Sequence, residues 1–120
     1  MELRGVHHVS LNIDDLEASK AFYTDVLGLN LLARPDAEIS VPGAWLGLPD
    51  GRELHLLVND LPEAKGQHFA FEVESVDSAV SHLSSKGIKT SEPRVMKGVC
   101  RQTFCSDPSG NLIEFNERLA

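Results

Sequence analysis

Two stretches of sequence decide the fold: His8-Val-Ser-Leu-Asn-Ile13 and His68-Phe-Ala-Phe-Glu-Val73. They begin sixty positions apart, each starts with a histidine, and in each every second residue is apolar. An apolar period of two predicts a β-strand with one face in the core. The same spacing recurring in both halves of the chain indicates an internal repeat, which has to be identified before any fold is assigned.

The repeat continues into a predicted helix after each strand. The segments Asp14–Glu17 and Glu74–Asp77 have the spacing of a helix capping box. Each predicted helix ends at a glycine, Gly28 or Gly87, the residue that a left-handed C-terminal turn favours. We therefore expect both copies to place a helix directly after their first strand.

The remainder of each copy is predicted to be three further strands. The turn sequences Pro49-Asp-Gly51 and Pro108-Ser-Gly110 lie fifty-nine positions apart, and Trp45 and Phe104 precede them at the same offset. The sequences after these turns read as the last strands, and the second strands are expected near residues 29–35 and 88–94. The predicted fold class is α+β, with two tandem βαβββ modules, about 4–60 and about 65–118, in one domain spanning 1–120.

Face parity brings four side chains together. Residues two apart on a strand share a face, and the histidines that open the two first strands lie out of phase with the apolar core positions. The same holds in the last strands for His55, between Leu54 and Leu56, and for Glu114, between Ile113 and Phe115. The repeat makes His8 the equivalent of His68 and His55 the equivalent of Glu114. Imidazole and carboxylate together suit zinc, nickel, manganese, iron or cobalt, so we predict one divalent-metal site.

Glu53 shares the predicted face of His55 and is the competing ligand. The repeat favours His55, because His55 and not Glu53 is the mate of Glu114. His7 has the opposite parity to His8, and we interpret it as structural. Cys100 and Cys105 are interpreted as small buried apolar residues rather than nucleophiles.

Composition limits the partners. The formal net charge is −7 and the pI about 5.1, which argues against nucleic acid and anionic membranes as ligands. No apolar run approaches the roughly 20 residues of a membrane span. Two cysteines in one segment do not suggest a disulfide framework. We expect a cytoplasmic protein that acts on a small molecule.

Several segments resemble the vicinal oxygen chelate superfamily, which includes glyoxalases, bleomycin-resistance proteins and extradiol dioxygenases. The resemblance covers about residues 5–117 and is carried by Val6–Leu11, Asp15–Leu29, Gly66–Val73 and Asp107–Glu114. It implies paired βαβββ modules that form a cup-shaped mixed sheet around a metal ion. It also implies a homodimer, and it leaves open whether the site lies within one chain or between two.

The family's ligand positions carry over to His8, His55, His68 and Glu114 in this sequence. Glyoxalase I enzymes usually have a carboxylate where His55 stands, so the resemblance does not extend to lactoylglutathione lyase activity itself. The first hypothesis is a lyase or isomerase acting on adjacent substrate oxygens through a metal-stabilised enediolate. Glu114 is the preferred general base, and His55 is the alternative.

Three other activities remain open from the sequence. His8, His68 and Glu114 alone would suit a non-haem iron dioxygenase. A thiol transferase acting on an antibiotic of the fosfomycin type has a similar ligand set. The third alternative, from a different class, is a metal-free drug-binding resistance protein.

Six further residues are predicted to bind the substrate. Trp45 and Phe104 would form an apolar wall, although they also suit an ordinary core. Gln102 and Arg101 could hold a substrate carboxylate or phosphonate, and for Arg101 a solvated role competes. Ser10 and Asn116 share the predicted face of the metal ligands.

Overall fold

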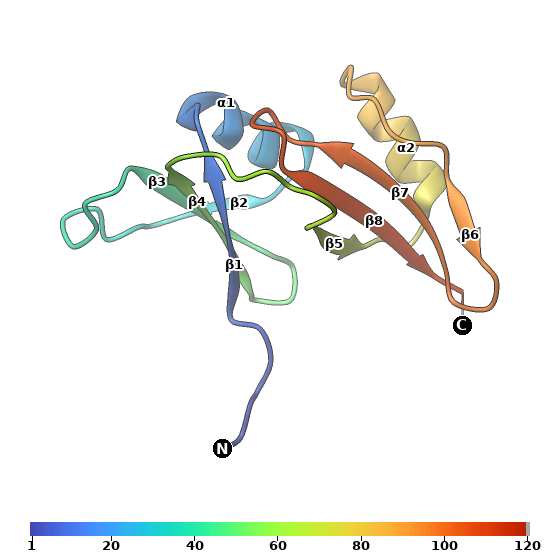
Figure 1. The fold of residues 1–120 in the computed structure, drawn as a ribbon, viewed down its shortest axis with the longest axis horizontal. Helices are drawn as coiled ribbons and strands as arrows, with labels where there is room; N and C mark the ends of the chain where they lie inside the picture. Colours follow the sequence, from blue (N-terminus) through green and yellow to red (C-terminus); the bar gives the residue numbers. More distant parts are fainter. Residues whose placement is uncertain (120) are drawn as a thin grey trace. The chain divides into compact units, whose positions relative to one another are not determined.

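The computed structural model describes residues 1–119 and has the predicted α+β architecture (Figure 1). The chain divides into two compact units, Met1–Pro62 and Glu63–Ala120. Each unit contains a four-stranded mixed sheet and a helix that packs on it. No helix within residues 1–119 has the length and apolar character needed to cross a membrane.

The first unit runs strand, helix, strand, strand, strand. Its elements are β1 (His8–Ile13), α1 (Leu16–Ala21), β2 (Asn30–Leu32), β3 (Gly43–Gly47) and β4 (Glu53–Val58). The strand order in the sheet is β1-β4-β3-β2. The first strand pairs in parallel with the last, and the other two pairings are antiparallel.

The second unit repeats this plan. Its elements are β5 (Phe69–Glu72), α2 (Val76–Ser85), β6 (Arg94–Met96), β7 (Cys100–Ser106) and β8 (Leu112–Arg118). The order β5-β8-β7-β6 and the single parallel pairing, here between β5 and β8, are the same as in the first unit. The helix α2 lies against β7 and β8 (Figure 1).

The two units also agree in strand register. Ser10 is opposite His55 in the parallel pair of the first unit, and Ala70 is opposite Glu114 in the second. On the antiparallel side, Trp45 is opposite His55 and Phe104 is opposite Glu114. The pairs of the second unit follow from those of the first by the offsets of sixty and fifty-nine, so the repeat in the sequence is also a repeat of strand register.

The second strand of the second unit differs from the prediction. Residues 88–94 were expected to be a strand, but β6 begins only at Arg94. Pro93 has no N–H to donate to a ladder, and Ser91 bonds to β7 in another way. Its N–H donates to the Phe104 carbonyl, and its hydroxyl accepts from the Phe104 N–H.

The helix boundaries refine two predictions. The capping residues are Asp15, whose carboxylate accepts from Ala18 N–H at 3.0 Å, and Ser75, whose hydroxyl accepts from Ser78 N–H at 3.1 Å. Both lie one residue after the predicted capping positions. After Ala21 the first helix continues as a π-helical turn, Phe22–Val26. The predicted stops are confirmed, because Gly28 and Gly87 have φ values of +76° and +78°.

Each unit has its own apolar core on the helix side of the sheet. The first is formed by fully buried residues from β1, the helix, β3 and β4: Ile13, Tyr23, Leu46, Leu54 and Leu56. The second draws its apolar residues from α2 and β8, namely Val76, Leu83 and Ile113, and also buries Thr103 of β7, whose hydroxyl donates to the Ser91 carbonyl. On β4 and β8 these core residues flank His55 and Glu114, which therefore point to the opposite face, as predicted.

The turn before β8 depends on one buried carboxylate. Asp107 is 5% exposed and accepts from the N–H groups of Ser109 and Asn111 at 2.9 and 2.8 Å, and from the Asn111 side-chain amide at 3.0 Å. Replacing it leaves three donors without this acceptor.

We expect Asp107→Ala to lower the free energy of unfolding by about 2–3 kcal/mol, because bonds to a buried carboxylate are among the stronger ones. Chemical denaturation monitored by circular dichroism measures the loss. Asp50→Ala is the control, since that residue is exposed and accepts from Arg52 N–H at 2.9 Å. Equal losses in the two variants would contradict the role given to Asp107.

Candidate functional site

In the second unit a histidine and a carboxylate are paired. The imidazole Nε2 of His68, just before β5, lies 3.0 Å from Oε1 of Glu114 on β8. Glu114 is 7% exposed, and its other oxygen accepts from the Asn116 side-chain amide at 2.7 Å. One carboxylate oxygen is therefore held by Asn116, and the other faces the imidazole.

The backbone fixes the other side of the His68 ring. Nδ1 lies 2.8 Å from the Gly66 carbonyl oxygen, which can only accept, so Nδ1 is the donor. This bond is the main cause that raises the pKa of His68, and the Glu114 carboxylate also raises it while partial burial opposes both. When His68 is neutral, its proton is on Nδ1 and the lone pair is on Nε2, facing Glu114.

In the first unit three aromatic rings form a stack across neighbouring strands. The His55 ring lies between those of Trp45 and His8. The ring centroids are 4.4 Å apart for Trp45 and 4.0 Å apart for His8, and the planes differ by 7° and 16°. His55 is buried at 8% exposure, while His8 is exposed. The pKa of His8 is lowered, first by burial of its ring and then by the neighbouring imidazoles of His55 and His7.

Glu53 contacts His55 directly, which the sequence interpretation did not anticipate. Its Oε1 lies 2.8 Å from His55 Nε2, and the bond from His55 is the main cause that lowers the pKa of Glu53. The sequence contained an indication of this contact, because residues 53 and 55 share a strand face. The repeat identified His55 as the equivalent of Glu114, but it could not show that Glu53 and His55 are hydrogen-bonded.

His7 also behaves differently from the strand pattern. Its Nδ1 lies 2.9 Å from Nδ1 of His8, and the two rings meet edge to face. Strand parity does not separate them, because β1 begins only at His8.

Three predicted binding residues, Trp45, Phe104 and Ser10, lie beside the ligand pairs. The rings of Phe104 and His68 meet edge to face, with centroids 5.2 Å apart, whereas Trp45 stacks on His55 in the other unit. Ser10 is exposed and lies opposite His55 in the register. The repeat mates Trp45 and Phe104 thus each contact a histidine of their own unit.

The remaining predicted binding residues have protein partners. Gln102 is buried, and its side-chain oxygen lies 3.8 Å from Cys100 Sγ. Arg101 donates to Asp77, in the first turn of α2, at 2.5 Å. Substrate contacts by these residues stay predictions.

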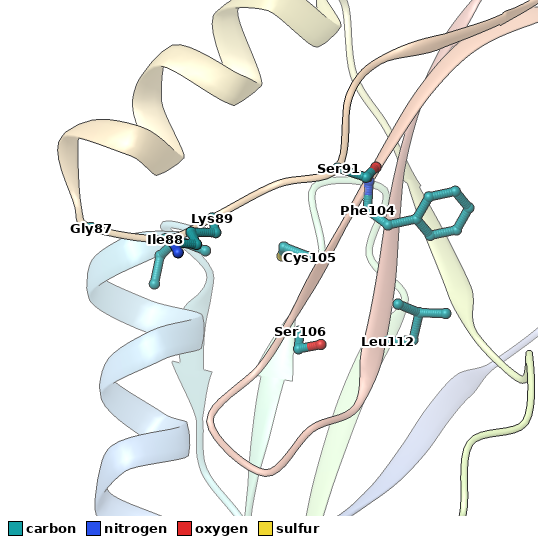
Figure 2. A pocket seen from close by; sticks show the side chains of 8 residues that line it. All are labelled: Gly87, Ile88, Lys89, Ser91, Phe104, Cys105, Ser106 and Leu112. Atoms are coloured by element: carbon teal, nitrogen blue, oxygen red, sulfur yellow. The ribbon is translucent and has the colours of Figure 1, made fainter.

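A pocket of about 500 Å³ lies in the second unit, between the segment after α2 and the strands β7 and β8 (Figure 2). Phe104, which contacts His68, is one of its lining residues. Cys105 also lines it, but burial, aided by Asp107, raises the pKa of that thiol to about 11. A thiol with this pKa is protonated at neutral pH, which agrees with interpreting Cys105 as a packing residue.

Neither unit on its own assembles a complete metal site. Within residues 1–119, no three His, Cys, Asp or Glu side chains form a set that could hold a metal ion. Each unit brings together two of the predicted ligands: His8 with His55, and His68 with Glu114.

Comparison with known proteins identifies relatives over nearly the whole chain. The sequence profile of the Glyoxalase/Bleomycin resistance protein/Dioxygenase superfamily matches residues 5–115. YaeR of Escherichia coli strain K12 is 34% identical, with 97% of this chain and 98% of YaeR covered. A probable lactoylglutathione lyase of Synechocystis is 33% identical, and the match covers 89% of this chain and 90% of that protein. The crystal structure of a glyoxalase family protein from Bacillus anthracis superposes with a TM-score of 0.87, at 27% identity and 98% coverage of both chains.

Proposed function

This chain belongs to the glyoxalase/bleomycin resistance protein/dioxygenase superfamily, and on that basis we propose that it is a metal-dependent lyase or isomerase. The substrate is a small molecule with two adjacent oxygens, and the reaction removes a proton next to a carbonyl. In this proposal His8 and His55 of the first unit and His68 and Glu114 of the second are the metal ligands. The observation that supports this proposal best is the His68–Glu114 pair, in which Asn116 donates to the carboxylate oxygen that does not face His68.

The geometry of that pair suits two neighbouring ligands of one ion. Zinc–nitrogen and zinc–oxygen bonds are about 2.0–2.2 Å long, so adjacent ligand atoms lie roughly 3.0–3.4 Å apart. The separation of His68 Nε2 and Glu114 Oε1 is 3.0 Å. The Gly66 carbonyl keeps the proton of neutral His68 on Nδ1, which leaves Nε2 able to coordinate.

The chemistry divides between the ion and the chain. A bound divalent metal would supply Lewis-acid polarisation of the two substrate oxygens. Glu114 is the group that takes the proton, because it is buried and one of its oxygens is held in place by Asn116. His55 is the other candidate base, because an imidazole that does not coordinate the metal has a nitrogen able to take a proton.

We expect the purified protein to contain close to one equivalent of a divalent metal, and His8→Ala and Glu114→Ala to lose most of it. Removing one ligand of a four-ligand site weakens binding strongly, while outer-shell changes cost about 10–100-fold. Elemental analysis of the purified variants measures the content. His82→Ala is the control, because His82 lies on α2 and is exposed. Full metal content in both ligand variants would refute the site.

The reaction type is tested with the metal-loaded protein. Screening α-keto, α-hydroxy and hemithioacetal compounds for exchange of the α-proton with solvent is expected to identify a substrate class. A preference for Fe(II) with consumption of oxygen would instead establish a dioxygenase.

A further inference from the structure

The pocket of the second unit forms because β6 is shorter than its neighbour β7. The pairing of the two strands extends only from Cys100 to Gln102 of β7. Further along β7, Ser91 is hydrogen-bonded to Phe104, and the segment before Ser91 leads back to the end of α2. The last residues of β7 lie beyond the reach of β6, and a cavity of about 500 Å³ lies beside them (Figure 2).

The backbone of β7 offers polar groups at this edge of the sheet. Both the N–H and the carbonyl of Phe104 are bonded to Ser91, so they point away from β8. In an antiparallel ladder the bonding side alternates from one residue to the next. Ser106, two residues further on, therefore directs its own N–H and carbonyl to the side on which the pocket lies. That N–H is a donor suited to an anion at the edge of the sheet.

The lining combines apolar surface with one positive charge. Among the eight lining residues that Figure 2 shows, only Lys89 is charged at neutral pH, because burial raises the pKa of the Cys105 thiol to about 11. The apolar surface comes from the segment after α2 and from β7 and β8: Ile88, Phe104, Cys105 and Leu112. A volume of this size suits a small molecule, and a lining with one cation and no carboxylate favours an anion.

Negative groups next to the lining are engaged by protein donors. Asp107, which follows Ser106, is 5% exposed and accepts from the backbone of Ser109 and Asn111. The carbonyls of residues 83 and 84, at the end of α2, accept from the N–H groups of residues 86–88. The charged side chain that a bound anion meets is therefore that of Lys89.

The pocket adjoins the sheet face that carries Glu114. Leu112 lies two residues before Glu114 on β8 and so shares its face, and Phe104 is opposite Glu114 in the register. The ring of Phe104 also meets that of His68, with centroids 5.2 Å apart. A molecule seated on Phe104 and Leu112 therefore lies beside the His68–Glu114 pair.

We propose that this pocket is the subsite for an anionic, partly apolar end of the substrate. A carboxylate or phosphate group binds at Lys89 and the Ser106 N–H, and the attached carbon atoms lie on Leu112 and Phe104. Binding of the anion itself needs no metal ion. Its part in the reaction rests on the proposed function, which places the two adjacent oxygens at the other end of the molecule.

Binding is tested with metal-free full-length protein and three ligands of similar shape: phenylacetate, phenyl phosphate and the neutral phenylacetamide. Titrations followed by ¹H–¹⁵N spectra show which backbone amides respond. We expect saturable shifts at Lys89 and Ser106 with at least one anion, with a Kd on the order of 1 mM for ligands of about ten non-hydrogen atoms. The anion that binds more tightly distinguishes a carboxylate site from a phosphate site. Phenylacetamide binding as tightly as both anions, or no saturable shift at Lys89 and Ser106, overturns the proposal.

The role of Lys89 is tested by Lys89→Met, which removes the charge and keeps an unbranched side chain. Because Lys89 is exposed, we expect the affinity for the tighter anion to fall by about three- to tenfold, between the effects of an exposed ion pair and of a hydrogen bond to a charged group. Lys89→Arg should retain most of the affinity. The matched control is Lys86→Met, an exposed residue outside the lining, for which we expect a change of less than about twofold. Equal losses in Lys89→Met and Lys86→Met would assign the effect to net charge alone.

The part played in the reaction is tested with the substrate that the screen identifies. We expect Lys89→Met to raise KM and to leave kcat within about twofold, because Lys89 binds the end of the molecule that does not react. A lowered kcat at unchanged KM would contradict the assignment. If an anion binds as described but the purified protein contains no metal, the pocket stands and the proposed function fails. If the metal binds at its four ligands but neither anion shifts Lys89 and Ser106, the proposed function stands and the pocket is not a subsite.

Discussion

Gly43→Ala is expected to lower the free energy of unfolding by at least about 3 kcal/mol, at the upper end of what overpacking costs. A Cβ on Gly43 would lie 2.0 Å from the backbone carbonyl oxygen of Leu56 and 3.1 Å from Nη2 of Arg34. The carbonyl cannot move away easily, because β4 is paired on both sides, with β1 and with β3. The Arg34 side chain is 5% exposed and donates to the Val41 carbonyl at 2.5 Å, so it is also confined.

The matched control is Gly47→Ala, because Gly43 and Gly47 are the two ends of β3. A Cβ there meets only side-chain carbons of Leu32, the nearest at 3.3 Å, and a leucine can rotate away. We expect a loss of less than about 1 kcal/mol. Denaturant unfolding curves of the two variants measure the difference, and losses within about 0.5 kcal/mol of each other would show that the backbone of β4 yields.

Glu114→Gln is expected to lower turnover in the proposed reaction by about 10²–10⁴-fold per metal-loaded site, the usual contribution of a positioned general base. The amide keeps the size of the side chain and an oxygen that can coordinate, but it cannot take a proton. Turnover must be divided by the metal content of each preparation, so that a weaker ligand is not mistaken for a missing base.

Asn116→Ala is the companion variant, because it frees the second oxygen of Glu114 without removing the carboxylate. We expect it to reduce turnover by about tenfold, with the pH profile changed and the metal retained. A Glu114→Gln protein that turns over within a few-fold of the wild type, at equal metal content, would assign the proton transfer to another group. His55 is then the first to test, by His55→Gln.

The order of the elements along the chain and their repetition were predictable because they follow from spacing alone. The offsets of sixty and fifty-nine make Ala70 the equivalent of Ser10 and Glu114 the equivalent of His55, and in the structure the two equivalent pairs share one register. The start of the second strand near residues 88–94 was not predictable. No apolar pattern encodes the hydrogen bond that the Ser91 hydroxyl accepts from the Phe104 N–H of β7. Its position depends on a side chain replacing a backbone partner.

The candidate site was predictable in part for a similar reason. Parity on β4 and β8 correctly placed His55 and Glu114 opposite the core faces, since strand geometry alone decides this. The partners of these residues depend on rotamers, which a sequence pattern does not contain. Glu53, for example, was recognised only as a rival of His55, whereas the structure has the two hydrogen-bonded to each other.

The parallel pairing of the first strand of each unit with its last has a consequence for synthesis on the ribosome. His8 is opposite Glu53, and Phe69 is opposite Ile113, so each sheet edge is joined by residues more than forty positions apart. The nascent chain holds β1 without a partner until Val58 has left the exit tunnel. Closing such long loops is slow compared with forming helices and hairpins. The first unit can nevertheless complete its sheet before all of the second has left the exit tunnel, because every strand it needs precedes Pro62.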